Sequence, residues 1–141
     1  MITIPIEISW VRKIARDALV DTGFTGGIFL SKSAARAAGA TLCEPPRMPR
    51  GPDGKRIDGQ ATVLRVRIPG ADVETETLAF CPDAPTREIL IGAFLLGRVG
   101  AALLIGTARY KFPRPSRGNP ACSGLDVGDW VIPRRPVEPW W

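Results

Sequence analysis

Hydrophobic and polar residues alternate with a period of two along much of the chain, a pattern typical of half-buried β-strands. It is clearest in residues 2–8, where every second residue is isoleucine, and Pro5 within this run favours an edge position. The pattern returns in residues 62–68 and 73–80, on either side of a Pro69-Gly70 turn, and predicts an antiparallel pair. We therefore expect an all-β chain.

Shorter apolar runs predict the remaining elements. Residues 18–20 and 28–30 are interpreted as strands that flank a glycine-containing loop. Ser31 or Ser33 can cap a brief helix that runs through Ala38 and ends at Gly39. Pro- and Gly-rich residues 43–58 contain Asp53-Gly54, a pair that favours a hairpin tip.

The last part of the body has three short segments. We expect a strand at residues 88–91, one or two helical turns at 93–99, and a buried strand at 101–105. This places one domain in residues 1–106 and a Pro-, Arg- and Trp-rich tail or wrapping arm in 107–141, because the frequent prolines exclude a continuing sheet or helix. Three interpretations of the tail stay open. It is disordered, it adds a strand at residues 129–132 that Trp130, Trp140 and Trp141 anchor on its own body or on a second subunit, or it is an inhibitory segment in or near a cleft.

Composition excludes several kinds of chemistry. The 141 residues contain no histidine, so a Ser-His or Cys-His nucleophile pair and a histidine zinc site are ruled out. The three cysteines are widely spaced and are interpreted as reduced thiols, and we expect no metal and no cofactor. No apolar run is long enough to span a membrane and no leader pattern is recognised, so we expect a cytoplasmic protein without a membrane partner. The net charge of +5 is scattered, which makes nucleic acid an unlikely partner.

The strongest candidate for chemistry is Asp21. The sequence Leu19-Val20-Asp21-Thr22-Gly23-Phe24-Thr25-Gly26 places a single carboxylate where an apolar strand breaks into a tight turn. A hydroxyl follows it, and a glycine allows backbone to approach a ligand. A simpler interpretation stays open, in which Asp21 is only a turn residue whose carboxylate accepts local N–H groups.

This segment resembles the active-site loop of the retropepsin-like aspartic peptidases, especially their small bacterial and archaeal members. Leu90-Ile91-Gly92-Ala93 is similar to the second landmark of that family, which lies beneath the catalytic loop and precedes a short helix. The resemblance covers residues 2–106. It implies a closed all-β barrel with one or two short helices and with a flap hairpin at residues 51–59. Phe94, the long basic flap segment and the tail depart from the family pattern.

The resemblance implies an endopeptidase in which Asp21 is catalytic and Thr22 and Gly23 support the loop. Gly23, Thr25, Asp53 and Gly54 would contact a peptide substrate. Aspartic peptidases use two carboxylates that share a proton, and this chain supplies one at the motif. We therefore expect a homodimer with Asp21 of both copies at the two-fold axis. The alternative is a catalytically idle module that uses the same cleft to bind peptides or mediate assembly.

Overall fold

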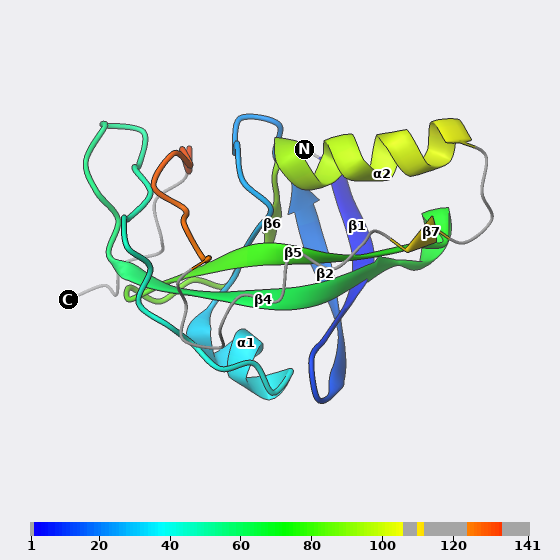
Figure 1. Ribbon diagram of the computed structural model, residues 1–141, viewed down its shortest axis with the longest axis horizontal. Coiled ribbons are helices and arrows are strands. Elements are labelled where there is room, and N and C mark those ends of the chain that lie inside the picture. The colour runs from blue at the N-terminus through cyan, green and yellow to red at the C-terminus, as the bar shows by residue number, and fades with distance from the viewer. Residues whose placement is uncertain (1, 106–109, 112–123, 134–141) are drawn as a thin grey trace.

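The computed structural model describes residues 2–105, 110–111 and 124–133. Seven strands, two α-helices and one 3₁₀-helix follow one another in these residues (Figure 1). In chain order they are β1 (Ile2–Ser9), β2 (Lys13–Val20), β3 (Ile28–Phe29), α1 (Lys32–Ala37), β4 (Gly59–Ile68), η1 (Pro69–Ala71), β5 (Val73–Pro82), β6 (Leu90–Ile91), α2 (Ala93–Ile105) and β7 (Tyr110–Lys111).

Six of these strands close into a barrel. The hydrogen-bonded order is β3-β6-β2-β1-β4-β5, and β3 also pairs with β5, which completes the ring. The β1–β2, β1–β4, β4–β5 and β3–β6 pairs are antiparallel, whereas β2–β6 and β3–β5 are parallel. The expected all-β barrel is thus confirmed in its coarse form, and β7 adds to it alongside β5.

The position of β1 explains its uneven burial. All eight of its residues pair with β2, but only Glu7, Ile8 and Ser9 also pair with β4. Pro5 therefore lies in the half of the strand that pairs with β2 but not with β4, in keeping with the edge position that proline favours. Ile6 and Ile8 are buried, whereas Ile2 is exposed.

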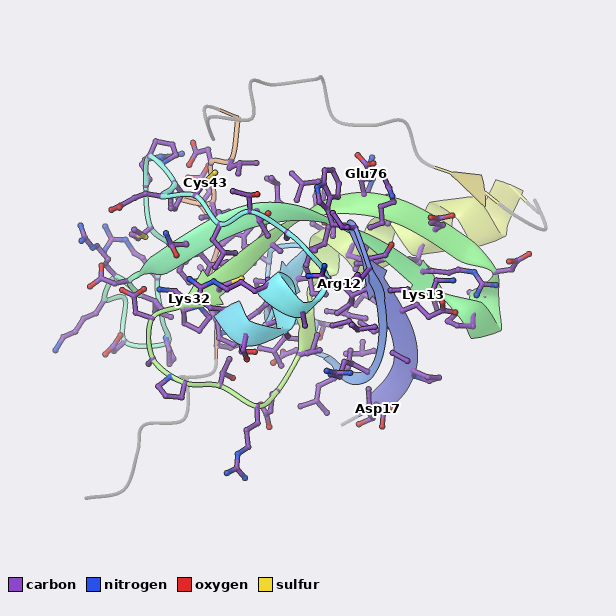
Figure 2. All side chains as sticks on the ribbon, turned by 90° about the horizontal axis from the view of Figure 1, so that it is seen from below. Arg12, Lys13, Asp17, Lys32, Cys43 and Glu76 are labelled. Atoms are coloured by element: carbon purple, nitrogen blue, oxygen red, sulfur yellow. The ribbon has the colours of Figure 1, made fainter. Side chains whose placement is uncertain are left out.

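Helix α1 begins and ends as its sequence predicts. The Ser31 hydroxyl caps it by accepting a hydrogen bond from the Ala34 N–H at 3.1 Å, and Gly39 takes a left-handed φ of 85° just beyond it. The side chain of Arg12, in the β1–β2 turn, donates to the Ala37 and Arg36 carbonyls at the other end (Figure 2). Arg12 thereby attaches α1 to the β1–β2 hairpin, the first hairpin of the chain.

The expected strand at residues 101–105 is wrong. Those residues continue α2, a single helix of 13 residues. A short apolar run fits a buried strand or a buried helix equally well, and here leucine and alanine, both strong helix formers, decide it. Leu95 and Val99, four residues apart, are buried in the main core and place α2 against the barrel. Within the described part of the chain, no helix has the length and apolar character that crossing a membrane requires.

The interpretation of the cysteines as reduced thiols is wrong for Cys43, which is disulfide-bonded. Cys81, by contrast, is a free thiol fully buried in the main core. Burial raises its pKa to about 12, and the nearby charges of Lys32 and Arg36 offset only part of that rise. Spacing along the chain did not reveal the disulfide, because pairing depends on which cysteines the fold brings together.

Candidate active site

Asp21 lies directly after β2, at the point where the strand leaves the barrel. Leu19 and Val20 pair in parallel with Leu90 and Ile91 of β6, and the Asp21 N–H continues this ladder by donating to the Ile91 carbonyl at 3.0 Å. The carboxylate turns back over its own loop, where its Oδ1 accepts a hydrogen bond from the Gly23 N–H at 3.1 Å. The barrel thus holds a half-buried carboxylate in one orientation.

The second sequence landmark packs directly beneath this loop. The Gly92 N–H donates to the Gly27 carbonyl at 2.9 Å, and the Ala93 N–H donates to the Phe24 carbonyl at 2.7 Å. A methyl group on Gly92 would collide with the carbonyl oxygen of Gly26. Residue 92 is therefore glycine because the two backbones approach too closely for any side chain.

The three residues of the motif share one turn. Thr22 and Gly23 are exposed, and the Phe24 N–H closes the turn onto the Asp21 carbonyl at 3.1 Å. Phe24 itself is fully buried in a second hydrophobic cluster, so it anchors the loop from below. The turn therefore brings the half-buried Asp21 together with the exposed Thr22 and Gly23.

Residues 51–59 include the hairpin tip that the sequence predicts. Arg50 and Arg56 form an antiparallel bridge, the Gly51 N–H donates to the Lys55 carbonyl at 2.8 Å, and Gly54 has a positive φ of 75°. The Asp53 carboxylate accepts the Lys55 N–H at 3.0 Å, so it stabilises the turn locally. Asp53 and Gly54 are exposed at the tip. No hydrogen bond that we find in the described ranges joins this tip to the Asp21 turn.

Instead, residues 124–133, here called the strap, lie between the hairpin and the loop after β2 (Figure 1). Val131 faces the loop: its carbonyl accepts from the Thr25 N–H at 3.2 Å, and its own N–H donates to the Thr25 hydroxyl at 2.9 Å. Trp130 and Ile132 face the hairpin arm: the Trp130 carbonyl accepts from the Arg50 N–H at 3.0 Å, and the Ile132 N–H donates to the Arg50 carbonyl at 2.8 Å. Residues 130–132 of the strap are therefore bound along both edges, as a paired strand would be, whereas residues 127–130 form a turn that the Trp130 N–H closes onto the Val127 carbonyl at 3.1 Å.

Side chains of the strap alternate between the interior and solvent. The Trp130 indole covers Gly26, where a methyl group would collide with it, and meets the Phe24 ring edge-on at 5.5 Å. Ile132 is fully buried in the second hydrophobic cluster, whereas Val131 is 43% exposed. Pro133 then reaches the turn itself, since a Cβ on Gly23 would lie 3.5 Å from the Pro133 ring and 3.3 Å from Asp21 Oδ1.

Ion pairs hold the beginning of the strap. Arg47 contacts Asp126 at 2.7 Å and Asp129 at 3.4 Å. The hydrogen bond from Arg47, followed by the one from the Gly128 N–H, lowers the pKa of Asp126. The same pair raises the pKa of Arg47, whose basic charge is thereby matched within the chain. Cys43, four residues before Arg47, lies on the same side of the molecule as this loop (Figure 2).

The strap is the part of the site that sequence reasoning placed least well. Alternation over residues 129–132 and the anchoring Trp130 were its signals, and Val131 does form a parallel bridge with Arg50. Its position beside Thr25 and Gly23 depends on contacts more than 100 residues apart in the chain, such as Val131 to Thr25 at a separation of 106. A single sequence contains no pattern that specifies such a pairing.

The described residues contain no group of three or more His, Cys, Asp or Glu side chains that could hold a metal ion. No protein-family model, no curated protein and no solved structure matches the chain. Any functional assignment must therefore be argued from the Asp21 turn and its surroundings.

Proposed function

We propose that this chain is one subunit of a homodimeric aspartic endopeptidase of the retropepsin-like type, with Asp21 of two copies forming the catalytic dyad. The observation that carries the proposal is the Asp21 turn, in which a half-buried carboxylate is fixed at a strand end by the Gly23 N–H. A rigid strand that positions an acid in an exposed turn is the arrangement that acid–base chemistry requires. The closed barrel and the glycine contact between residues 92 and 26 support it.

The dyad needs a second carboxylate close to the first, and a second copy of the chain supplies it. Two carboxylates at short distance cannot both be ionised cheaply, so one holds a proton while the other acts as a base. The ionised Asp21 removes a proton from a water molecule, which attacks the peptide carbonyl. The protonated Asp21 of the other copy donates to the carbonyl oxygen, and the roles exchange when the amine departs.

Thr22 and Gly23 have supporting roles in this scheme. Both are exposed in the same turn as Asp21, where a two-fold partner can reach them. Thr22 would hydrogen-bond to the partner loop and fix the two carboxylates, while the Gly23 carbonyl would accept from the substrate backbone. Thr25 already binds an extended chain through its N–H and hydroxyl, which supports a substrate-binding role. Asp53 and Gly54 would need the hairpin to close before they could contact the same substrate.

A second candidate function is a catalytically idle module that binds peptides. The strap favours it, because an extended segment already lies along Thr25 and reaches Gly23.

Two sets of ion pairs weigh against nucleic acid as a partner. Arg47 pairs with Asp126 and Asp129, and Arg56 pairs with Asp58. The compartment stays a proposal: disulfides are rare in reducing cytosol, so the bond at Cys43 weighs against our expectation of a cytoplasmic protein.

A peptide-cleavage assay separates the two candidates. Wild type, Asp21→Asn and the control Asp17→Asn are incubated with a mixed peptide library between about pH 3.5 and 7. Asp17 is an exposed carboxylate on the same strand, so its substitution makes the same chemical change outside the turn. The proposal predicts cleavage by wild type and Asp17→Asn and none by Asp21→Asn. Equal products from all three proteins would refute the mechanism.

A further inference from the structure

The strap is recognised mainly through its backbone. Four hydrogen bonds, two to Thr25 and two to Arg50, hold the main chain of residues 130–132 on both edges. Backbone recognition of this kind accepts any extended peptide, and selectivity then comes from pockets for alternate side chains. The strap therefore reveals what the groove can bind.

We propose that the groove between Thr25 and Arg50 binds extended peptides that carry an aromatic residue two positions before an aliphatic one. We further propose that the chain's own strap occupies this groove and competes with such peptides. The inference names the ligand of the proposed active site, and it rests on the proposed function where it concerns catalytic activity.

The aromatic position is set by a pocket that Gly26 leaves open. The Trp130 ring lies where a methyl group on Gly26 would project, and it packs edge-on against Phe24 at 5.5 Å. Such an aromatic contact contributes beyond the area that it buries, so removal of the ring weakens binding. A smaller side chain at this position would leave the floor of the pocket uncovered.

The aliphatic position lies two residues later and is deeper. Ile132 is fully buried among Phe24, Phe29, Ala61, Phe80 and Leu90, in the same cluster that supports the Asp21 turn. Between the two anchors, Val131 is exposed, so the groove sets no requirement there. The preference is therefore aromatic, then any residue, then aliphatic.

Competition follows from where the strap leads. Pro133 and the Asp21 carboxylate flank the same face of Gly23, at 3.5 Å and 3.3 Å from the position of a Cβ. A peptide that reached Asp21 along Thr25 would need the place that residues 131–133 now fill. The strap thus limits access to the carboxylate as an intramolecular ligand.

The test weakens the strap without removing it, because its buried Ile132 and Val127 belong to a hydrophobic cluster of the fold. Val131→Pro in the full chain deletes the N–H that donates to the Thr25 hydroxyl, while Val131→Ala keeps that N–H and trims only an exposed side chain. A fluorescein-labelled peptide with the sequence of residues 124–133 is titrated into each protein, and fluorescence anisotropy reports its binding. The control peptide carries alanine in place of the tryptophan.

Val131→Pro should bind the labelled peptide roughly fivefold to tenfold more tightly than wild type or Val131→Ala, the factor expected for loss of one hydrogen bond. The alanine peptide should bind each protein more weakly than its parent. Equal binding by all three proteins, or equal binding of both peptides, would overturn the inference. So would cooperative loss of the β-sheet circular dichroism signal in Val131→Pro, because the strap would then be a permanent strand of the barrel.

Two measurements separate this inference from the proposed function. Peptide cleavage is recorded for the proteins with Asp21 intact, and the titration is repeated with their Asp21→Asn versions, so that binding is measured without cleavage. If no protein cleaves any peptide but Val131→Pro still binds more tightly, the peptidase proposal fails and the groove assignment stands. If wild type and Val131→Pro cleave equally and bind the peptide equally, the groove assignment fails and the peptidase proposal stands. If both hold, cleavage by Val131→Pro with Asp21 intact rises by about the factor seen in binding.

Discussion

The contact between Gly92 and Gly26 predicts a large effect for the smallest possible substitution. A Cβ at residue 92 would collide with the Gly26 carbonyl oxygen and lie 2.8 Å from the Phe24 ring. The first obstacle is backbone, which has no rotamer to adopt, so the loop that carries Asp21 must move. Gly92→Ala therefore perturbs the candidate site from beneath, without touching Asp21.

The expected loss of stability in Gly92→Ala follows from the cost of overpacking. Inserting a methyl group into a well-packed region costs about 1–3 kcal/mol, which for a chain of this size lowers Tm by about 4–12 °C. Gly97→Ala is the matched control, because a Cβ there meets no atom within 4 Å and residue 97 lies inside α2. Alanine is the better helix former by about 1 kcal/mol, so this variant should raise Tm by about 4 °C.

Thermal unfolding followed by circular dichroism measures both variants, and peptide cleavage is recorded in parallel. The same chemical change, five residues apart, is expected to have opposite signs. A Gly92→Ala protein with the Tm and cleavage rate of wild type would refute the close packing of the two landmarks.

Three further predictions concern other parts of the chain. Hydrogen bonds from Lys13 and then Arg67 lower the pKa of Glu7 from 4.5. The ionised Glu7 therefore stabilises the fold above pH 4.5, and this contribution is lost as pH falls through the lowered pKa. Glu7→Gln should lower Tm at pH 7 and match the Tm of wild type in strong acid, and a Tm difference that does not change with pH would contradict this. The Cys81 thiol, with its pKa raised to about 12, should resist iodoacetamide at pH 8 in the native protein and react in denaturant, as mass spectrometry will show. Ser31→Ala should destabilise the chain by about 1 kcal/mol in chemical denaturation and Ser33→Ala by less, because Ser31 caps α1.

Local patterns predicted the elements that local physics determines. Alternation identified β1, β4 and β5, and the capping serine with the trailing glycine identified α1. Asp21 and Gly92 were also found from the sequence, and the structure brings their two loops together. The strands, α1 and the Asp21 turn depend on periodicity, capping and turn chemistry, which act over a few residues, whereas Gly92 was identified through the family resemblance.

The features that were missed have two causes, an ambiguous local pattern and contacts between distant segments. The apolar run at residues 101–105 became part of α2 because a short run alone does not distinguish helix from strand. The strap and the disulfide at Cys43 both bring distant segments together, and neither leaves a local pattern. Predicted roles for Asp53 and Gly54 stay predictions, because the hairpin tip stabilises its own turn and the strap lies between the hairpin and the loop.

The central claim is that two copies of the chain share one catalytic dyad. Mixing wild type with Asp21→Asn, under conditions that exchange subunits, tests it directly. At equal amounts and constant total protein, only about a quarter of the dimers carry both carboxylates, so the cleavage rate should fall to about a quarter of the wild-type value. A rate of one half would show that each chain acts alone, and it would contradict the shared dyad.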